Sequence, residues 1–145
     1  MNTTITWLLA ILSLLIFLPL LGVQLLMLFR PNDRKTKDLI IGKDGEWRDP
    51  THKRSALAFA WSDWLVIFPL LISGNIGVLG GHSWGFPLWL AMGILSVYFS
   101  VMFWVLEKKY TYPLYGWIAY YTYYWGMFLY WGIAVIIYAL VQLIQ

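Results

Sequence analysis

The stretch ALAFAWSDWLVIFPLLISGNIGVLGG, residues 56–81, decides the fold of this chain. It can cross a bilayer, because about 20 apolar residues rising 1.5 Å each match a hydrocarbon core of roughly 30 Å. It also carries an acid, Asp63, which lies on the order of 10 Å from its start, between Trp61 and Trp64. A carboxyl group at that depth is costly unless it is protonated, hydrogen-bonded or facing water, so Asp63 is the first candidate for function.

The composition predicts an integral membrane protein. Of the 145 residues, 61% are hydrophobic and only 12% are charged, and the mean hydropathy of +0.67 is far too high for a soluble domain. The length allows one domain over residues 1–145. The sequence has no cysteine, which excludes disulfides and thiolate metal ligands.

The apolar segments predict an all-α fold with four transmembrane helices in a bundle. The residues before the first segment, MNTT, lack the positive charge of a signal peptide, so we expect that segment to be a retained helix. The polar connector that follows contains Asp44-Gly45, a turn signal that predicts a small hairpin at the headgroup surface. The predicted spans are residues 5–29, 56–80, 86–107 and 115–143, and the connector is residues 30–55.

The basic residues predict the orientation of these helices. Eight of the ten Lys and Arg residues lie in the connector, and the other two are Lys108 and Lys109. If the short turn at residues 80–87 lies outside, every basic residue falls on one side of the membrane. We therefore expect an antiparallel bundle with cytoplasmic basic loops and both termini outside, in a bacterial inner membrane, either plasma or intracytoplasmic. The net charge of +3 indicates topology, and we expect no nucleic-acid partner.

Small residues at helical spacing predict where helices approach closely. In lipid, helix association depends on packing, and small side chains let two backbones come together. One such stripe ends the second span, and another follows a face of the third. The predicted packing residues are Ser73, Gly77, Gly81, Gly93 and Ser96.

Polar side chains of all four spans are predicted to lie in the inner half of the bilayer, counted inward from the cytoplasmic boundaries. If the helices turn these residues inward, they form a pocket roofed by aromatic rings, which would bind a ligand. The alternative is that Asp63 has a structural role. It would then be protonated or hydrogen-bonded and hold two helices together, or its side chain would reach the membrane–water interface. The predicted ligand-binding residues are Asp63, Gln24, Ser100, Tyr120, Tyr121, Tyr124, Trp61 and Trp64.

No motif identifies a metal, a cofactor or an enzymatic reaction. The predicted topology places His52 and His82 on opposite faces of the membrane, where they cannot share a metal ion. No second catalytic group lies at the depth of Asp63, so we expect no enzymatic activity.

Two classes of function fit the sequence. The first is a non-catalytic subunit or assembly factor of a larger membrane complex, packed against partner helices, lipids or pigments. The second is a stand-alone binder or transporter of a hydrophobic or cationic small molecule, with Asp63 as counter-ion and an aromatic cage. The expected partners are membrane lipids, other integral membrane subunits and a hydrophobic ligand or pigment.

Overall fold

The chain folds into helices that are long and apolar enough to cross a membrane. The structure, a computed structural model, describes residues 3–107 and 126–145. Within these residues there are four such helices, judged by length and composition. They are α1 (Thr4–Phe29), a continuous helix over Pro50–Leu79, α5 (Gly85–Glu107) and α7 (Gly126–Ile144).

The prediction of four apolar helices is confirmed, and the first and third begin within one residue of the predicted positions. The last part of the predicted fourth span coincides with α7. Residues 115–125 of that span lie outside the described residues, as do Lys108 and Lys109.

The second long helix begins at Pro50, six residues earlier than predicted. It comprises α3 (Pro50–Ser62), the π-helical turn η1 (Asp63–Ile67) and α4 (Phe68–Leu79). Asp49 caps it by accepting a hydrogen bond from the His52 backbone N–H at 2.8 Å. Proline is favourable at a first helical position because its missing N–H has no partner there anyway. The last residues of the predicted connector are therefore helical.

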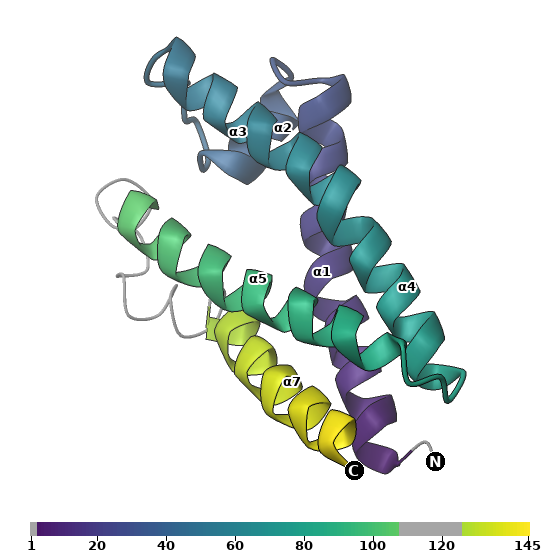
Figure 1. The fold of residues 1–145 in the computed structure, drawn as a ribbon. Coiled ribbons are helices and arrows are strands. Elements are labelled where there is room, and N and C mark those ends of the chain that lie inside the picture. Colours follow the sequence, from purple (N-terminus) through teal and green to yellow (C-terminus); the bar gives the residue numbers. More distant parts are fainter. Residues whose placement is uncertain (1–2, 108–125) are drawn as a thin grey trace. The chain divides into compact units, whose positions relative to one another are not determined.

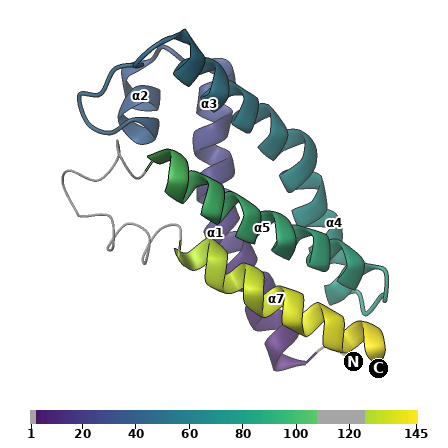
Figure 2. The ribbon, with the colours of Figure 1, turned by 60° about the vertical axis from the view of Figure 1, so that its left-hand side comes forward.

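The connector contains a short helix in place of the predicted hairpin. Helix α2 (Arg34–Ile40) lies beside the end of α1 (Figure 2). A turn follows it, in which the Gly45 backbone N–H donates to the Gly42 carbonyl at 2.9 Å. Gly42 has φ +107° and Asp44 has φ 62°, both in the left-handed region. The predicted turn forms, but the hairpin is wrong because the residues before the turn are helical.

The contacts divide the chain into two compact units, and each is described by itself. Unit 1 comprises Met1–Ile16 and Leu70–Gln145, and unit 2 comprises Phe17–Pro69. In unit 1, α5 and α7 lie side by side (Figure 1). Ser96 Oγ of α5 donates to the Phe128 carbonyl of α7 at 2.7 Å.

The core of unit 1 holds a buried hydrogen-bond network around Asn75. Asn75 Nδ2 donates to Ser13 Oγ at 3.0 Å, and Asn75 Oδ1 accepts from the Trp89 indole N–H at 3.3 Å. Ser13 Oγ also donates to the Ala10 carbonyl at 2.7 Å. Since a buried polar group is costly without partners, this network stabilises one arrangement of the first half of α1, α4 and α5.

Helix α4 ends in a Schellman motif that turns the chain into α5. The His82 backbone N–H donates to the Gly77 carbonyl at 2.8 Å, and the Gly81 N–H donates to the Val78 carbonyl at 3.1 Å. Gly81 has φ +75°, which a glycine adopts without strain. Gly81, predicted to pack in a small-residue stripe, thus lies beyond the helix, and a Cβ there would meet nothing within 4 Å.

Candidate functional site

Asp63 begins the π-helical turn η1 and is 5% exposed. In this turn the Phe68 backbone N–H donates to the Asp63 carbonyl, five residues back, where an α-helix would use a residue four back. Pro69 follows directly. In a regular α-helix its ring would clash with a carbonyl group of the preceding turn, and proline has no N–H to donate to that carbonyl. The wider π-helical turn relieves this clash. Such π-turns occur frequently at functional sites.

Gln24 of α1 is the side chain that meets the acid. Its side-chain amide lies close enough to the Asp63 carboxyl group, within unit 2, to interact with it. Among residues 3–107 and 126–145, no Lys or Arg forms an ion pair with Asp63. A carboxyl group with an amide partner and no fixed cation can take up a proton or bind an external cation.

The two tryptophans that flank the acid have different surroundings. The Trp64 indole N–H donates to the Leu21 carbonyl of α1 at 3.2 Å, and its ring packs on Phe68 with centroids 4.8 Å apart. Trp64 therefore ties η1 to α1. The Trp61 side chain is exposed, and no hydrogen bond of its indole N–H to another described residue is seen.

The other predicted pocket residues belong to a different unit from Asp63 or lie outside the described residues. Ser100 belongs to unit 1, where its buried hydroxyl donates to the Ser96 carbonyl of its own helix at 2.8 Å. Tyr120, Tyr121 and Tyr124 lie outside the described residues. Within unit 2, the structure brings the predicted residues Gln24 and Asp63 together.

The predicted packing residues of α5 lie against α7. A Cβ added at Gly93 would sit 2.9 Å from the Gly132 carbonyl oxygen, and one added at Gly132 would sit 2.9 Å from the Gly93 carbonyl oxygen. The two backbones are therefore in direct contact, beside the hydrogen bond from Ser96.

The predicted packing residues of α4, Ser73 and Gly77, have different surroundings. A Cβ at Gly77 would sit 2.7 Å from Gly85 Cα, so Gly77 allows the close turn into α5. Ser73 is only half-buried. Gly74, one position later, was not predicted, and a Cβ there would sit 2.9 Å from Trp89 Cδ1.

Sequence reasoning missed the polar contacts that hold unit 1 together. The Trp131 indole N–H donates to the Leu9 carbonyl at 3.0 Å, and the Thr6 hydroxyl is hydrogen-bonded to the Tyr138 hydroxyl. The signal in the sequence is that Thr6, Leu9 and Ser13 recur every three or four residues, on one face of α1. That signal gives the buried face but not the partners.

No group of three or more His, Cys, Asp or Glu side chains in the described part of the chain is placed to hold a metal ion. No family model, curated protein or solved structure matches this chain. Evidence for its function therefore comes from its own residues.

Proposed function

We propose that this chain is a small non-catalytic subunit or assembly factor of a larger membrane protein complex. Its four apolar helices form an antiparallel bundle, with both termini outside and the basic connector in the cytoplasm. Its outer faces pack against partner helices, lipids or pigments.

The phenol of Tyr98 carries this proposal. Tyr98 lies near the middle of α5 and is 59% exposed. Its hydroxyl has no hydrogen-bond partner among the residues that the structure describes. Water is absent at the centre of a bilayer, so a phenol there needs a protein partner. A helix of another subunit supplies one.

The neighbouring polar groups support this interpretation by contrast. Ser96, two residues before Tyr98, is buried and bonded to α7, and Asn75 is bonded inside the core of unit 1. A second outward phenol, Tyr130, is 54% exposed on α7. In the described part of unit 1, the inward side chains of Ser96 and Asn75 are hydrogen-bonded, whereas the rings of Tyr98 and Tyr130 are exposed on the α5–α7 pair.

Substitution of two tyrosines by phenylalanine tests this proposal, because each removes a single hydroxyl. An interhelical hydrogen bond in a membrane contributes about 1 kcal/mol, so Tyr98→Phe should lower partner recovery from gently solubilised native membranes about fivefold. It should leave the stability of the isolated chain unchanged. The control is Tyr138→Phe, whose hydroxyl bonds Thr6, and which should lower the stability of the isolated chain but keep the partners. Recovery of the chain alone, or equal recovery with Tyr98→Phe, would contradict the proposal.

A second candidate rests on the Gln24–Asp63 pair. A buried carboxyl group with an amide partner at a π-turn suits a stand-alone binder or transporter of a hydrophobic or cationic small molecule, with nearby aromatic rings as a cage. In this case Asp63→Asn leaves the fold intact and abolishes uptake of a lipophilic cation, such as tetraphenylphosphonium, into proteoliposomes.

The same variant separates the two candidates. A packing subunit gives no uptake that depends on Asp63, with or without the substitution. A complete failure of Asp63→Asn to accumulate in the membrane would mark the acid as structural and exclude its role as a counter-ion.

A further inference from the structure

The connector, residues 30–55, is an ordered structure held at the ends of two long helices. The Trp47 indole N–H donates to the Pro31 carbonyl at 3.3 Å. Lys53 Nζ in the first turn of α3 donates to Asn32 Oδ1 at 2.7 Å. Both bonds reach back to residues that directly follow α1, so the connector stays next to the point where α1 ends.

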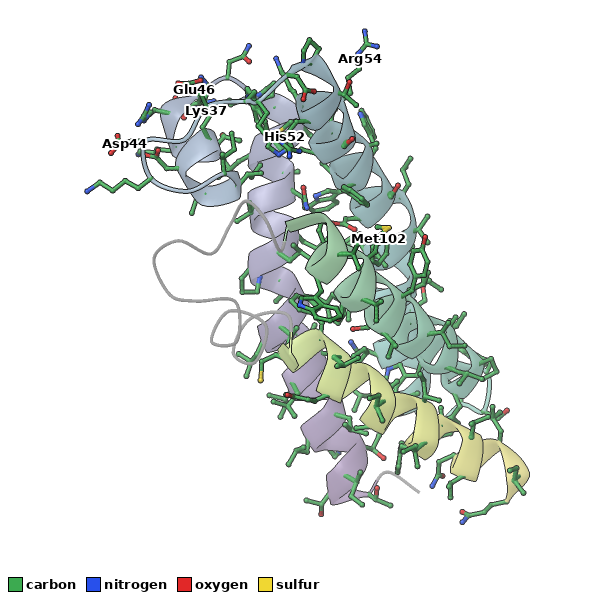
Figure 3. The ribbon with its side chains drawn as sticks, turned by 90° about the vertical axis from the view of Figure 1, so that its left-hand side faces the viewer. Lys37, Asp44, Glu46, His52, Arg54 and Met102 are labelled. Atoms are coloured by element: carbon green, nitrogen blue, oxygen red, sulfur yellow. The ribbon has the colours of Figure 1, made fainter. Side chains whose placement is uncertain are left out.

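Part of the positive charge of the connector is neutralised internally. Arg34 forms ion pairs with Asp38 at 3.2 Å, with Glu46 at 3.7 Å and with Asp44. Lys37 pairs with Glu46, and the two side chains lie together in Figure 3. Arg34 and Lys37 are therefore compensated and contribute little to the external field.

Four other cations are exposed and have no ion pair with any residue in 3–107 or 126–145. Arg54 points away from the ion pairs in Figure 3. Asp33 is an exposed acid close to them in the sequence. One acid beside four cations leaves the net charge of this group positive. We name the set the outward cations: Arg30, Lys35, Lys43 and Arg54.

Exposed apolar side chains accompany the outward cations. Leu39 is 58% exposed and follows Lys35 by one helical turn, so both lie on one face of α2, while Thr36 is buried on another. Phe29, which is 77% exposed, directly precedes Arg30. A helix face that combines cations with exposed apolar groups is typical of segments that lie on a membrane surface.

We propose that the outward cations, with Leu39 and Phe29, bind the anionic phospholipid headgroups of the membrane that surrounds the helices. The charges are complementary, and the surface begins at the last residue of an apolar helix, where headgroups are within reach. Each basic residue near an anionic surface strengthens binding about fivefold. This inference does not depend on the proposed packing function.

A fluorescent label on the connector tests the inference in the full chain. The sequence contains no cysteine, so Leu39→Cys gives one labelling site for an environment-sensitive dye. The labelled protein is reconstituted in vesicles of phosphatidylcholine, and in vesicles of equal parts phosphatidylcholine and phosphatidylglycerol. We expect a blue-shifted emission in the anionic vesicles that disappears at high salt.

Charge variants identify the residues responsible. The double variant Lys35→Gln with Lys43→Gln should lower the binding constant of the connector for phosphatidylglycerol, obtained from the emission shift, about twenty-fivefold. This corresponds to about fivefold per cation. Lys35→Arg with Lys43→Arg, which keeps both charges, should restore it. If the glutamine variant does not accumulate, the salt dependence of the otherwise unaltered labelled chain still decides.

Three results would overturn the inference. One is equal emission in neutral and anionic vesicles. Another is an unchanged response in the glutamine variant. The third is the same blue shift on neutral vesicles after addition of inorganic phosphate or of a soluble acidic protein, because that would assign the cations to a free anion or to a protein partner.

Discussion

Substitution of Gly93 by alanine tests the direct contact between α5 and α7. The new Cβ would lie 2.9 Å from both the Gly132 carbonyl oxygen and Ile136 Cγ1, and 3.0 Å from Val135 Cγ1. Ordinary contacts begin near 3.4 Å, so the helices would have to separate by about half an ångström. Overpacking of this kind costs about 1–3 kcal/mol.

A matched control isolates this cost. Alanine is intrinsically about 1 kcal/mol better than glycine within a helix, and this gain would mask part of the loss at Gly93. Gly22→Ala in α1 has the same intrinsic gain, but its Cβ would meet nothing within 4 Å. We therefore expect Gly93→Ala to be less stable than Gly22→Ala by about 1–3 kcal/mol.

Equilibrium unfolding in mixed micelles, followed by circular dichroism, measures this difference. Gly132→Ala should give a similar loss, and the double variant should lose less than the sum, since both glycines serve one contact. Equal stability of Gly93→Ala and Gly22→Ala would refute the close approach of the two helices.

Two further predictions concern the Asn75 network and the Asp49 cap. Asn75→Ala leaves the Trp89 indole N–H without its acceptor in the core, so the free energy of unfolding should fall by about 1–3 kcal/mol in the same assay; no loss would contradict the network. The hydrogen bond from the His52 backbone N–H lowers the pKa of Asp49 from its ordinary 3.8. The ionised cap therefore stabilises α3 fully above pH 3.8, and this stabilisation is lost as the pH falls through the lowered pKa. Asp49→Asn, a neutral cap, should remove this acid sensitivity, measured as hydrogen exchange of the His52 amide; equal sensitivity of both proteins would contradict it.

The candidate site was predictable only in part. The residue type and depth of Asp63 marked it as unusual, and the same depth count placed Gln24 near it. The indole N–H of Trp64, a predicted ligand-binding residue, donates to the Leu21 carbonyl of α1, a partner that the sequence did not indicate. The hydroxyl of Ser100 donates to the Ser96 carbonyl of its own helix, a partner that residue spacing alone does not identify. Depth along a helix follows from counting residues, but the direction of a side chain depends on how the helix is rotated.

The sequence by itself determined the class of this protein and the extent of its apolar helices. An apolar segment must satisfy its backbone hydrogen bonds internally in lipid, and the bilayer sets its length, so both properties can be counted along the chain. The tertiary structure decided which side chains meet. The bond from Asn75 to Ser13 joins residues 62 positions apart, and the contact of Gly93 with Gly132 joins two different helices. Such pairs depend on the rotation and crossing of neighbouring helices, which packing fixes and residue spacing does not.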